Sequence, residues 1–409
     1  MTRVSPAVYR RRRLVVFGTT GVVVTLLGSA TIIGIAPLPP ASITAVTATD
    51  LTNETAQLDI PQFGTTVFEA DGFGILAQAK IDTPAPIASM AKLITALVVL
   101  DARPIQPGAP GPSISFDATD VAELTRSIEN DESRADVIDG MSLSERDVIT
   151  VMLVKSANNY ALSLARWAFG SEDAYVSAAN AWLHKNGFES TVVTDASGLS
   201  PETQSTPREL LEIGARSLDN EVIATAVAKV STSIDPIGTI ENSNKLLGTL
   251  GVNGIKTGTT DEAGACLLFS SMLPVGTTSV RIVGVTLGAP SHPELDDALT
   301  GLLSTIQAGF HEVTPVTSGK AVATAVTAWG TSTNLIAQDT VSQLVWSDTP
   351  VTLSTATSVS ATGSLGSGAG EVAVTIGSET TRVALTRETE MSDPGFAWRV
   401  AHIDLLFSH

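Results

Sequence analysis

The chain has 409 residues, of which 43% are hydrophobic and only 5% aromatic, so it is long enough for two folded domains with aliphatic cores. Its formal net charge of −18 would repel a phosphate backbone, which argues against nucleic acid as a partner. A single cysteine, Cys266, excludes an intrachain disulfide, and the five histidines are scattered, so we expect neither a metal site nor another cofactor.

The N-terminus predicts a membrane-spanning helix. Residues 1–13 contain five arginines and no acidic residue, and residues 14–36 carry no charge. The uncharged stretch is long enough to span a bilayer, whereas the apolar core of a secretory signal usually has about 7–15 residues. Basic residues before the span predict a cytoplasmic tail and the bulk of the chain outside the cell. The alternative is a cleaved signal with its small-residue site at 28–30.

Residues 37–57 begin with three prolines and continue rich in Thr and Ala, which is typical of a semi-rigid linker. Residues 65–70 and 75–80, joined by the turn residues 71–74, then predict a β-hairpin.

Apolar residues recur at helical spacing through residues 89–101, which predicts a buried helix. Ser89 then lies at or near the N-terminus of this helix, and Lys92 lies one turn later on the same face. A helix N-terminus offers backbone N–H groups and a partial positive charge to a developing oxyanion.

Residues 142–218 are predicted to be mostly helical. Ser142-Leu143-Ser144-Glu145 resembles a capping box, and Thr206-Pro207 begins a later helix with proline in its first turn. Ser156-Ala157-Asn158 lies between two apolar runs, which predicts a turn between two helices. The acidic run at 129–132 is predicted to be a solvated loop.

The character of the chain changes to strands at 255–260, 265–271 and 280–287, and a helix is predicted at about 294–310. Beyond residue 314, short Val- and Thr-rich runs alternate with Gly/Ser-rich turns, which predicts a small β-sandwich, with no amphipathic C-terminal membrane helix after it. These runs are 321–327, 344–346, 351–355, 371–376 and 381–385.

Three short strings are the candidate chemical groups: Ser89-Met90-Ala91-Lys92, Ser156-Ala157-Asn158 and Lys256-Thr257-Gly258. Taken singly, each has an ordinary structural explanation: a helix start, a turn and the end of a strand. As an ordered set they indicate a serine nucleophile, a lysine that deprotonates it, a polar relay and a cationic strand that receives an anionic substrate.

The set resembles the serine D-alanyl-D-alanine carboxypeptidases, the low-molecular-mass penicillin-binding proteins. Residues 86–97 resemble the nucleophile helix of that family, 195–199 its Gly-Leu segment, and 244–247 its approach to the Lys-Thr-Gly strand. The resemblance covers about residues 60–313. It implies the α/β (α+β) penicillin-binding, β-lactamase-like transpeptidase fold, in which an antiparallel sheet packs with a helical cluster.

Carried over by position, the resemblance implies Ser89 as nucleophile, Lys92 as its base and Ser156 as proton relay to the leaving amine. It implies a substrate-binding set that holds the peptide backbone and its terminal carboxylate, with the backbone N–H groups of Ser89 and Thr259 as the oxyanion hole. That set is Asn158, Lys256, Thr257, Gly258 and Thr259. Departures from the family pattern are Asn159 in place of Asp, Thr259 in place of an aromatic or His, and no arginine within 288–294.

The implied function is removal of the terminal D-Ala from peptidoglycan stem peptides ending in D-Ala-D-Ala, with β-lactam antibiotics as covalent inhibitors. Two alternatives remain at this point. A β-lactamase of class A would need a Glu-x-x-Leu-Asn segment after Ser156, which is absent. A catalytically silent wall-binding or scaffold protein would use the β-rich domain.

The resulting expected division of the chain is a basic tail (1–13), a membrane anchor (14–36), a linker (37–57), a catalytic domain (58–313) and a C-terminal β-rich domain (314–409).

Overall fold

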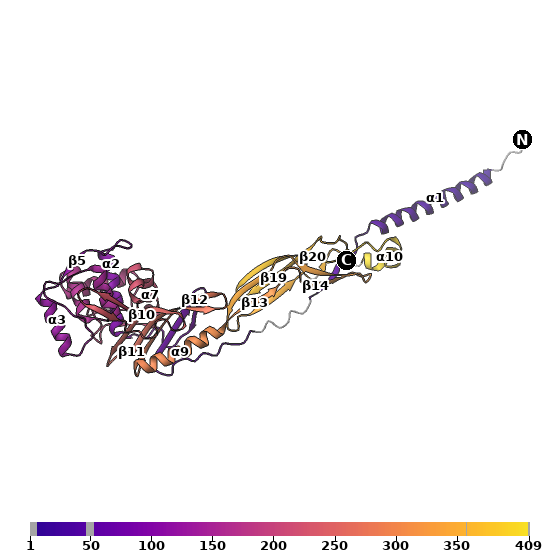
Figure 1. Ribbon diagram of the computed structural model, residues 1–409. Coiled ribbons are helices and arrows are strands. Elements are labelled where there is room, and N and C mark those ends of the chain that lie inside the picture. Colours follow the sequence, from indigo (N-terminus) through magenta and orange to yellow (C-terminus); the bar gives the residue numbers. More distant parts are fainter. Residues whose placement is uncertain (1–5, 46–52, 357, 408–409) are drawn as a thin grey trace. The chain divides into compact units, whose positions relative to one another are not determined.

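The computed structural model describes residues 6–45, 53–356 and 358–407. The chain divides into two compact units. One comprises Ala56–His311, and the other combines Met1–Thr55 with Glu312–His409. Figure 1 shows the elements of both units, coloured along the chain.

The 56–311 unit is built on a five-stranded antiparallel sheet in the order β10-β11-β12-β2-β3. The predicted hairpin and the three later strands are all present. The later strands are longer than expected, because the antiparallel pairing continues beyond the apolar runs into small and polar residues. The bounds are β2 (Thr65–Ala70), β3 (Gly74–Ala77), β10 (Val252–Thr260), β11 (Gly264–Val275) and β12 (Thr278–Ala289).

A cluster of helices packs with this sheet, as the fold class required. Helix α2 (Ala91–Ala102) is at its centre: ten of its twelve residues are buried, because apolar side chains surround it on all sides. It contacts α4, α5, α6 and α7, while α7 and α9 pack on the sheet. The other helices are α3 (Ala118–Glu129), α4 (Glu145–Val154), α5 (Asn158–Phe169), α6 (Glu172–Lys185), α7 (Pro207–Leu218), α8 (Glu221–Val227) and α9 (His292–Gly309).

Short strand pairs brace the loops between these helices. They are β4 (Ala85–Pro86) with β7 (Gln204–Ser205), β5 (Ser113–Ser115) with β6 (Ser142–Ser144), and β8 (Ser231–Ile234) with β9 (Gly238–Glu241).

Two helix N-termini were predicted from capping patterns in the sequence, at 142–145 and at Thr206-Pro207. Thr206 caps α7 with Pro207 at its first position, as predicted. The capping box proposed at Ser142 is wrong, because residues 142–144 pair as strand β6. The cap lies two residues later, where the Ser144 side chain accepts a hydrogen bond from the backbone N–H of Asp147.

The second unit contains a seven-stranded sheet in the order β17-β19-β20-β15-β14-β1-β18 and the pair β13-β16. Each of the five predicted runs corresponds to a strand, although the run 321–327 extends one residue beyond β14, and four further strands were not predicted: β1, β13, β15 and β18. The bounds are β1 (Ala41–Ala45), β13 (Phe310–Val316), β14 (Ala321–Val326), β15 (Ser332–Ala337), β16 (Val341–Trp346), β17 (Val351–Thr355), β18 (Ser358–Val359), β19 (Gly368–Ile376) and β20 (Glu379–Arg387).

Strand β1 lies inside the segment expected to be a linker. It pairs with β14 and β18, and Ala41 is fully buried. Residues 41–45 are therefore part of the sheet rather than a free spacer. The alternation of Ala41, Ile43 and Ala45 with polar residues is too short to stand out in a Thr/Ala-rich stretch.

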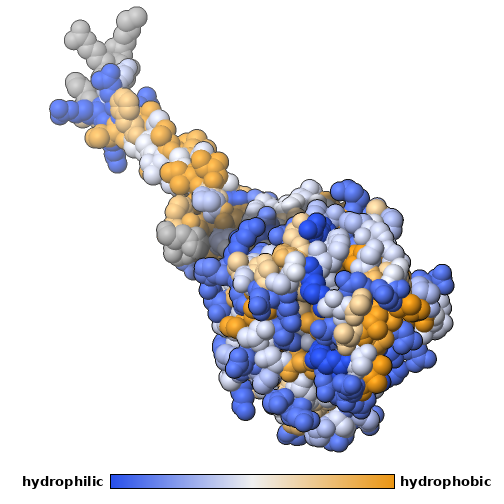
Figure 2. Space-filling model, turned by 90° about the vertical axis from the view of Figure 1, so that its left-hand side faces the viewer, coloured by the Kyte–Doolittle hydropathy of each residue, from blue (hydrophilic) through white to orange (hydrophobic). Residues whose placement is uncertain are grey.

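Helix α1 (Pro6–Ile35) contains the predicted span. Its segment Tyr9–Ile35 has a mean hydropathy of 1.8 in its most apolar window, none of which is buried by protein. Figure 2 shows this apolar surface, with hydrophilic side chains toward the N-terminal end of the helix. Two short helices, α10 (Phe396–Ala401) and α11 (Ile403–Leu406), end the described chain, and α10 packs against α1.

Glu145, at the first position of α4, makes a stability prediction possible. The residue is fully buried, and neither carboxylate oxygen has a hydrogen-bond partner among the described residues. Burial raises the pKa of Glu145 to about 7, partly opposed by Arg103. Because this pKa exceeds the unfolded value of about 4.3, stability falls as pH rises from about 4 through 7. Glu145→Gln should therefore raise the free energy of unfolding at pH 8 by about 2 kcal/mol, and by much less near pH 5.

Urea unfolding of both proteins at pH 5 and pH 8 measures this difference. Glu294→Gln, which changes an exposed first-turn glutamate of α9, is the matched control. An equal gain from both variants at pH 8 would contradict the assignment to a buried carboxylate.

Candidate active site

The first string forms the turn that enters α2. Ser89 lies in a 3₁₀ turn, Ala88–Met90, immediately before the helix, so it is close to the predicted N-terminal position. Ala88 has a φ of +45°, a left-handed conformation that costs a non-glycine residue about 1–2 kcal/mol. The surrounding packing compensates for this cost, since Ile87, Ala88 and Met90 are all buried.

Lys92 is fully buried, and its ammonium nitrogen has three neighbours. Nζ lies 2.8 Å from Ser89 Oγ, 2.7 Å from Asn158 Oδ1 and 2.7 Å from the carbonyl oxygen of Ser197. Burial and then the charge of Lys256 hold the pKa of Lys92 well below its usual value, partly opposed by Asp195 and Glu132.

The second string is the turn between α4 and α5, as predicted. Ser156 is buried and has a φ of +58°, so it is also held in the left-handed region. Lys256 from β10 donates to Ser156 Oγ at 2.9 Å and to the carbonyl oxygen of Thr257 at 3.0 Å. Burial lowers the pKa of Lys256 to about 7.

Asn158, the first residue of α5, connects the two strings. Its Oδ1 accepts from Lys92, and its Nδ2 donates to Glu132 Oε2 at 3.2 Å. The prediction of a solvated loop at 129–132 is therefore wrong for Glu132, which also accepts from Arg126 and Ser127. Asn130 also donates to this carboxylate, so four donors converge on it, and this tertiary arrangement is not evident from the charge pattern alone.

The third string lies along β10 against the nucleophile turn. A Cβ at Gly258 would meet Ala88 Cβ at 3.0 Å and the backbone nitrogen of Ser89 at 3.3 Å, so this position needs glycine for the strand to approach. Thr257 Oγ1 lies 2.5 Å from Ser243 Oγ, and Thr259 Oγ1 lies 2.6 Å from His292 Nε2. The structure thus brings all eight predicted site residues to one place.

Three residues that contact the predicted site residues were not themselves predicted to act here: Glu132, Ser243 and His292. His292, at the start of α9, lies in the stretch that was noted only for lacking an arginine. Burial, reinforced by Lys256, lowers the pKa of His292 below its usual value. His292 is recognised as part of the site only because it contacts Thr259 in space. The two residues are 33 positions apart in sequence, so no local pattern indicates this contact.

Asp195 organises the turn that supplies the Ser197 carbonyl. Its carboxylate accepts from the backbone N–H groups of Ser197, Gly198 and Leu199 and from the Thr203 hydroxyl. This arrangement aims the Ser197 carbonyl at Lys92.

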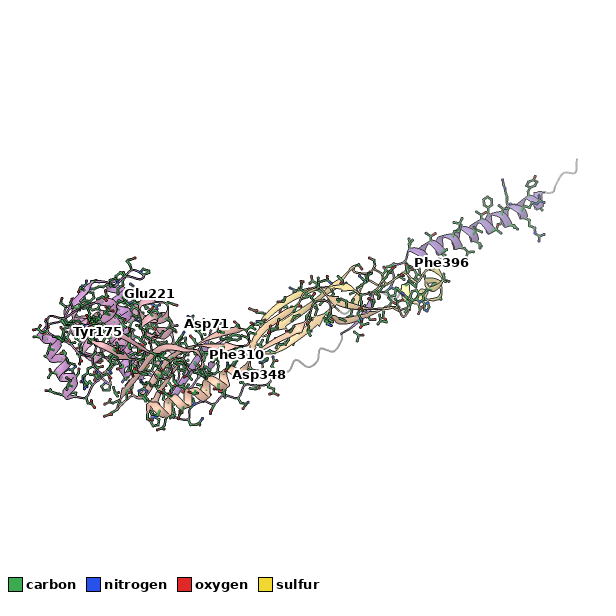
Figure 3. All side chains as sticks on the ribbon, viewed as in Figure 1. Asp71, Tyr175, Glu221, Phe310, Asp348 and Phe396 are labelled. Atoms are coloured by element: carbon green, nitrogen blue, oxygen red, sulfur yellow. The ribbon has the colours of Figure 1, made fainter. Side chains whose placement is uncertain are left out.

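A second set of hydrogen bonds ties the turn to the core. Thr95 of α2 lies 2.8 Å from the hydroxyl of Tyr175, labelled in Figure 3, and donates to the carbonyl of Ala196. Asn159, which departs from the Asp of the family pattern, is fully buried. Its amide accepts a hydrogen bond from the backbone N–H of Ala135 and donates one to the Ala135 carbonyl, so this side chain supports the loop that contains Ala135.

The packing of Gly198 predicts how strongly the nucleophile turn depends on this segment. Gly198 has a φ of +82°, and a Cβ there would lie 1.9 Å from the carbonyl oxygen of Ala88. Gly198→Ala should displace the Ser89 turn, lower the free energy of unfolding by about 3 kcal/mol and slow acylation of Ser89 by a labelled β-lactam at least about tenfold.

Gly187→Ala is the matched control, because Gly187 has a φ of +85° but nothing lies within 4 Å of its Cβ position. This variant should lose only about 1 kcal/mol and keep its acylation rate. Similar losses in both variants would show that backbone strain, rather than the clash with Ala88, is responsible.

Comparison with known proteins agrees with this geometry. Residues 52–291 match the D-alanyl-D-alanine carboxypeptidase family. A D-alanyl-D-alanine endopeptidase of Pseudomonas aeruginosa is 30% identical over 49% of this chain and 63% of its own length. The D-alanyl-D-alanine carboxypeptidase DacA of Escherichia coli K12 is 25% identical over 68% of this chain and 70% of its own.

Solved structures share the fold. Penicillin-binding protein 5 of Haemophilus influenzae superposes with a TM-score of 0.57 at 21% identity, covering 81% of this chain and 99% of that protein. The Streptomyces K15 DD-transpeptidase gives 0.53 at 22% identity, covering 60% of this chain and 98% of its own. The family match extends over more than half of the sequence and includes every one of the three strings, and the chain therefore belongs to the D-alanyl-D-alanine carboxypeptidase family, the low-molecular-mass penicillin-binding proteins.

Proposed function

We propose that this chain is a membrane-anchored serine DD-carboxypeptidase that removes the terminal D-Ala from peptidoglycan stem peptides through an acyl-enzyme on Ser89. The observation that carries the proposal is the 2.8 Å contact between the fully buried Lys92 Nζ and the Oγ of Ser89, which is itself only partly buried. A serine hydroxyl is a weak nucleophile, so a base within hydrogen-bond distance is the requirement that must be met first.

The partners of Lys92 favour a neutral amine. The Asn158 Oδ1 and Ser197 carbonyl oxygens can only accept, so they take the two N–H bonds of a neutral amine. The nitrogen lone pair then faces the Ser89 hydroxyl, which donates its proton as Oγ attacks the carbonyl carbon of the penultimate D-Ala. Burial and Lys256 both stabilise this neutral form.

Ser156 and Lys256 serve the leaving group in this proposal. The C–N bond to the terminal D-Ala breaks as its nitrogen takes a proton through Ser156, whose hydroxyl is held by Lys256 at 2.9 Å. Water then attacks the acyl-enzyme, releases the shortened peptide and returns the proton to Ser89.

The remaining residues bind and orient the substrate. Asn158 Nδ2 holds the peptide backbone, displacing its contact with Glu132, while Lys256, Thr257 and Thr259 receive the terminal carboxylate. Gly258 lets β10 approach the nucleophile turn, so that the backbone N–H groups of Ser89 and Thr259 form an oxyanion hole. Such a donor contributes about 3–4 kcal/mol to catalysis.

Helix α1 supplies the location. We infer that it anchors the chain in the cell membrane as a single span, because its apolar surface is unburied and five arginines precede its uncharged part. The catalytic unit then faces the cell wall, where the proposed substrate is found.

Ser89→Ala should abolish D-Ala release from a pentapeptide ending in D-Ala-D-Ala, a loss of at least about 10³-fold, because the acyl-enzyme cannot form. Ser177→Ala, an exposed serine on α6, should release D-Ala at the wild-type rate. Quantifying free D-Ala measures both. Equal release by wild type and Ser89→Ala would eliminate the assignment, and no release by either would favour the scaffold alternative.

The reaction of the wild type with β-lactams separates a peptidase from a β-lactamase. Penicillin should label Ser89 covalently and leave slowly, since no Glu-x-x-Leu-Asn segment follows Ser156 to activate a deacylating water. A chromogenic cephalosporin should accordingly be turned over slowly by the wild type. Rapid turnover would make the chain a β-lactamase.

The two lysine pKa values predict a two-sided pH profile. The acylation rate should fall as pH drops through the depressed pKa of Lys92, because the protonated amine cannot accept the serine proton. Above about pH 7, Lys256 loses the charge that receives the substrate carboxylate, so KM for the peptide should rise. Rates of acylation and peptide hydrolysis between pH 5 and 9 measure both limbs. An acylation rate that holds steady well into acid would rule out the neutral-lysine mechanism.

A further inference from the structure

His292 contacts the proposed site from a separate element, the start of α9, and the reaction described above does not use it. Its Nε2 lies 2.6 Å from Oγ1 of Thr259, a hydroxyl proposed to receive the terminal carboxylate of the substrate. Thr259 is exposed on β10 and His292 is half-buried, so a substrate can reach the hydroxyl while the imidazole lies behind it. A group that fixes the hydrogen of this hydroxyl therefore controls how a carboxylate binds there.

The Thr259 hydroxyl has a single hydrogen, so it donates to one acceptor at a time. If it donates to an unprotonated His292 Nε2, only its oxygen lone pairs face the carboxylate, which can itself only accept. If Nε2 carries a proton, Nε2 donates to Oγ1, and the hydroxyl hydrogen is free to be donated to the carboxylate. A carboxylate held by Thr259 thus requires a proton on Nε2 of His292.

The surroundings favour a neutral imidazole before the substrate binds. Burial, reinforced by Lys256, holds the pKa of His292 below its usual value. His292 is also the first residue of α9, an 18-residue helix whose N-terminal end carries a partial positive charge. A carboxylate bound at Thr259 brings a negative charge close to the imidazole, which favours the protonated form. The charge of His292 therefore depends on whether the carboxylate is present.

No carboxylate of the 56–311 unit, all of which the structure describes, forms an ion pair with His292 in advance. Glu294, on the same helix, is exposed and accepts from the Ser291 hydroxyl instead. Helix α9 packs on β11, which has no charged residue, and on β12, whose single arginine pairs with Asp71. The other charged residues nearest to His292 or Thr259 in the sequence are Asp296, Asp297, Asp261 and Glu262.

We propose that His292 is a positioning residue that couples carboxylate binding to a proton: Nε2 takes up a proton from solvent as the terminal carboxylate binds, and it then donates to Thr259 Oγ1. The Thr259 hydroxyl donates in turn to the carboxylate, and the imidazolium adds a second positive charge beside Lys256. This inference rests on the proposed function, and it selects substrates that end in a free carboxylate. No covalent bond changes at His292. When the C–N bond has broken and D-Ala leaves with its carboxylate, the imidazole returns its proton to solvent.

The test measures KM and kcat at pH 6 and pH 8 for a pentapeptide ending in D-Ala-D-Ala, and for the same peptide with a terminal carboxamide. His292→Gln keeps a hydrogen-bond donor but cannot become charged. Its KM for the free acid should therefore rise about tenfold at pH 6 and less than about twofold at pH 8, where the wild-type imidazole is mostly neutral, with little change in kcat. The kcat/KM of the carboxamide peptide should be the same in wild type and variant.

His292→Arg, which is charged at every working pH, should restore the wild-type KM at pH 6 and lower KM below the wild-type value at pH 8. His184→Gln, which changes an exposed histidine of α6, is the matched control and should alter neither substrate at either pH. Proton uptake can be measured in the Ser89→Ala background, which binds the peptide without cleaving it. Calorimetry at pH 7 in buffers of different ionisation enthalpy should show protons taken up on binding, and fewer once His292→Gln is added.

Three results would overturn the role of His292 and leave the proposed function intact. They are equal losses by His292→Gln at pH 6 and pH 8, equal losses on the carboxylate and carboxamide peptides, and no loss at all. The first would show a packing role, since a purely structural contact does not depend on pH. Absence of D-Ala release by the wild type at both pH values would overturn the proposed function itself.

Discussion

The candidate active site depends on burying two lysine amines beside one another. Taking an ammonium group out of water costs several kcal/mol, and a second one nearby raises the cost further. Lys92 and Lys256 are both buried. The cost is reduced in two ways: the pKa of each lysine is lowered, which favours the neutral amine, and oxygen acceptors surround each nitrogen. The same desolvation that is unfavourable for stability lowers the pKa of Lys92 and so favours the neutral amine that the proposed mechanism requires.

This requirement explains why so many separate elements converge. The acceptors of Lys92 come from the entry of α2, the start of α5 and the Ser197 turn, and those of Lys256 from the Ser156 turn and β10 itself. Movement of any one of these elements would therefore remove an oxygen partner from a buried nitrogen. The left-handed backbone at Ala88 and Ser156 is tolerated for the same reason, since the buried surroundings hold each residue in place.

Close backbone approach is the second constraint, and it makes the sheet and the helical cluster a single site. Gly258 brings β10 against the Ser89 turn, and Gly198 brings the Asp195 turn against Ala88 from another direction. Ser89, the proposed nucleophile, is thereby fixed between a strand and a loop that are far apart in sequence, which is the preorganisation that electrostatic catalysis requires. Glu132, bonded to Asn158, connects this site to a neighbouring open cavity whose lining residues are polar or charged.

Residue patterns with local causes were predictable. The buried α2 follows from apolar residues on all faces, the α7 start from Thr206-Pro207, and the antiparallel sheet from runs of β-forming residues. Local patterns gave wrong predictions where hydrogen-bonded pairing with a distant segment determined the secondary structure. Residues 142–144 became a strand because residues 113–115 lie beside them, and β1 exists because β14 and β18 offer it partners.

By itself, the sequence determined the family, the identity and order of the three reactive strings, and the helix able to span a membrane, because each depends on residue type and short-range spacing. Only the tertiary structure decided what surrounds those strings. His292 beside Thr259, Ser243 beside Thr257 and Glu132 beside Asn158 join segments separated by 14 to 33 positions. Hydrogen bonds and desolvation act over a few ångströms in space, so no pattern along the chain could reveal which of its many polar residues would share that space.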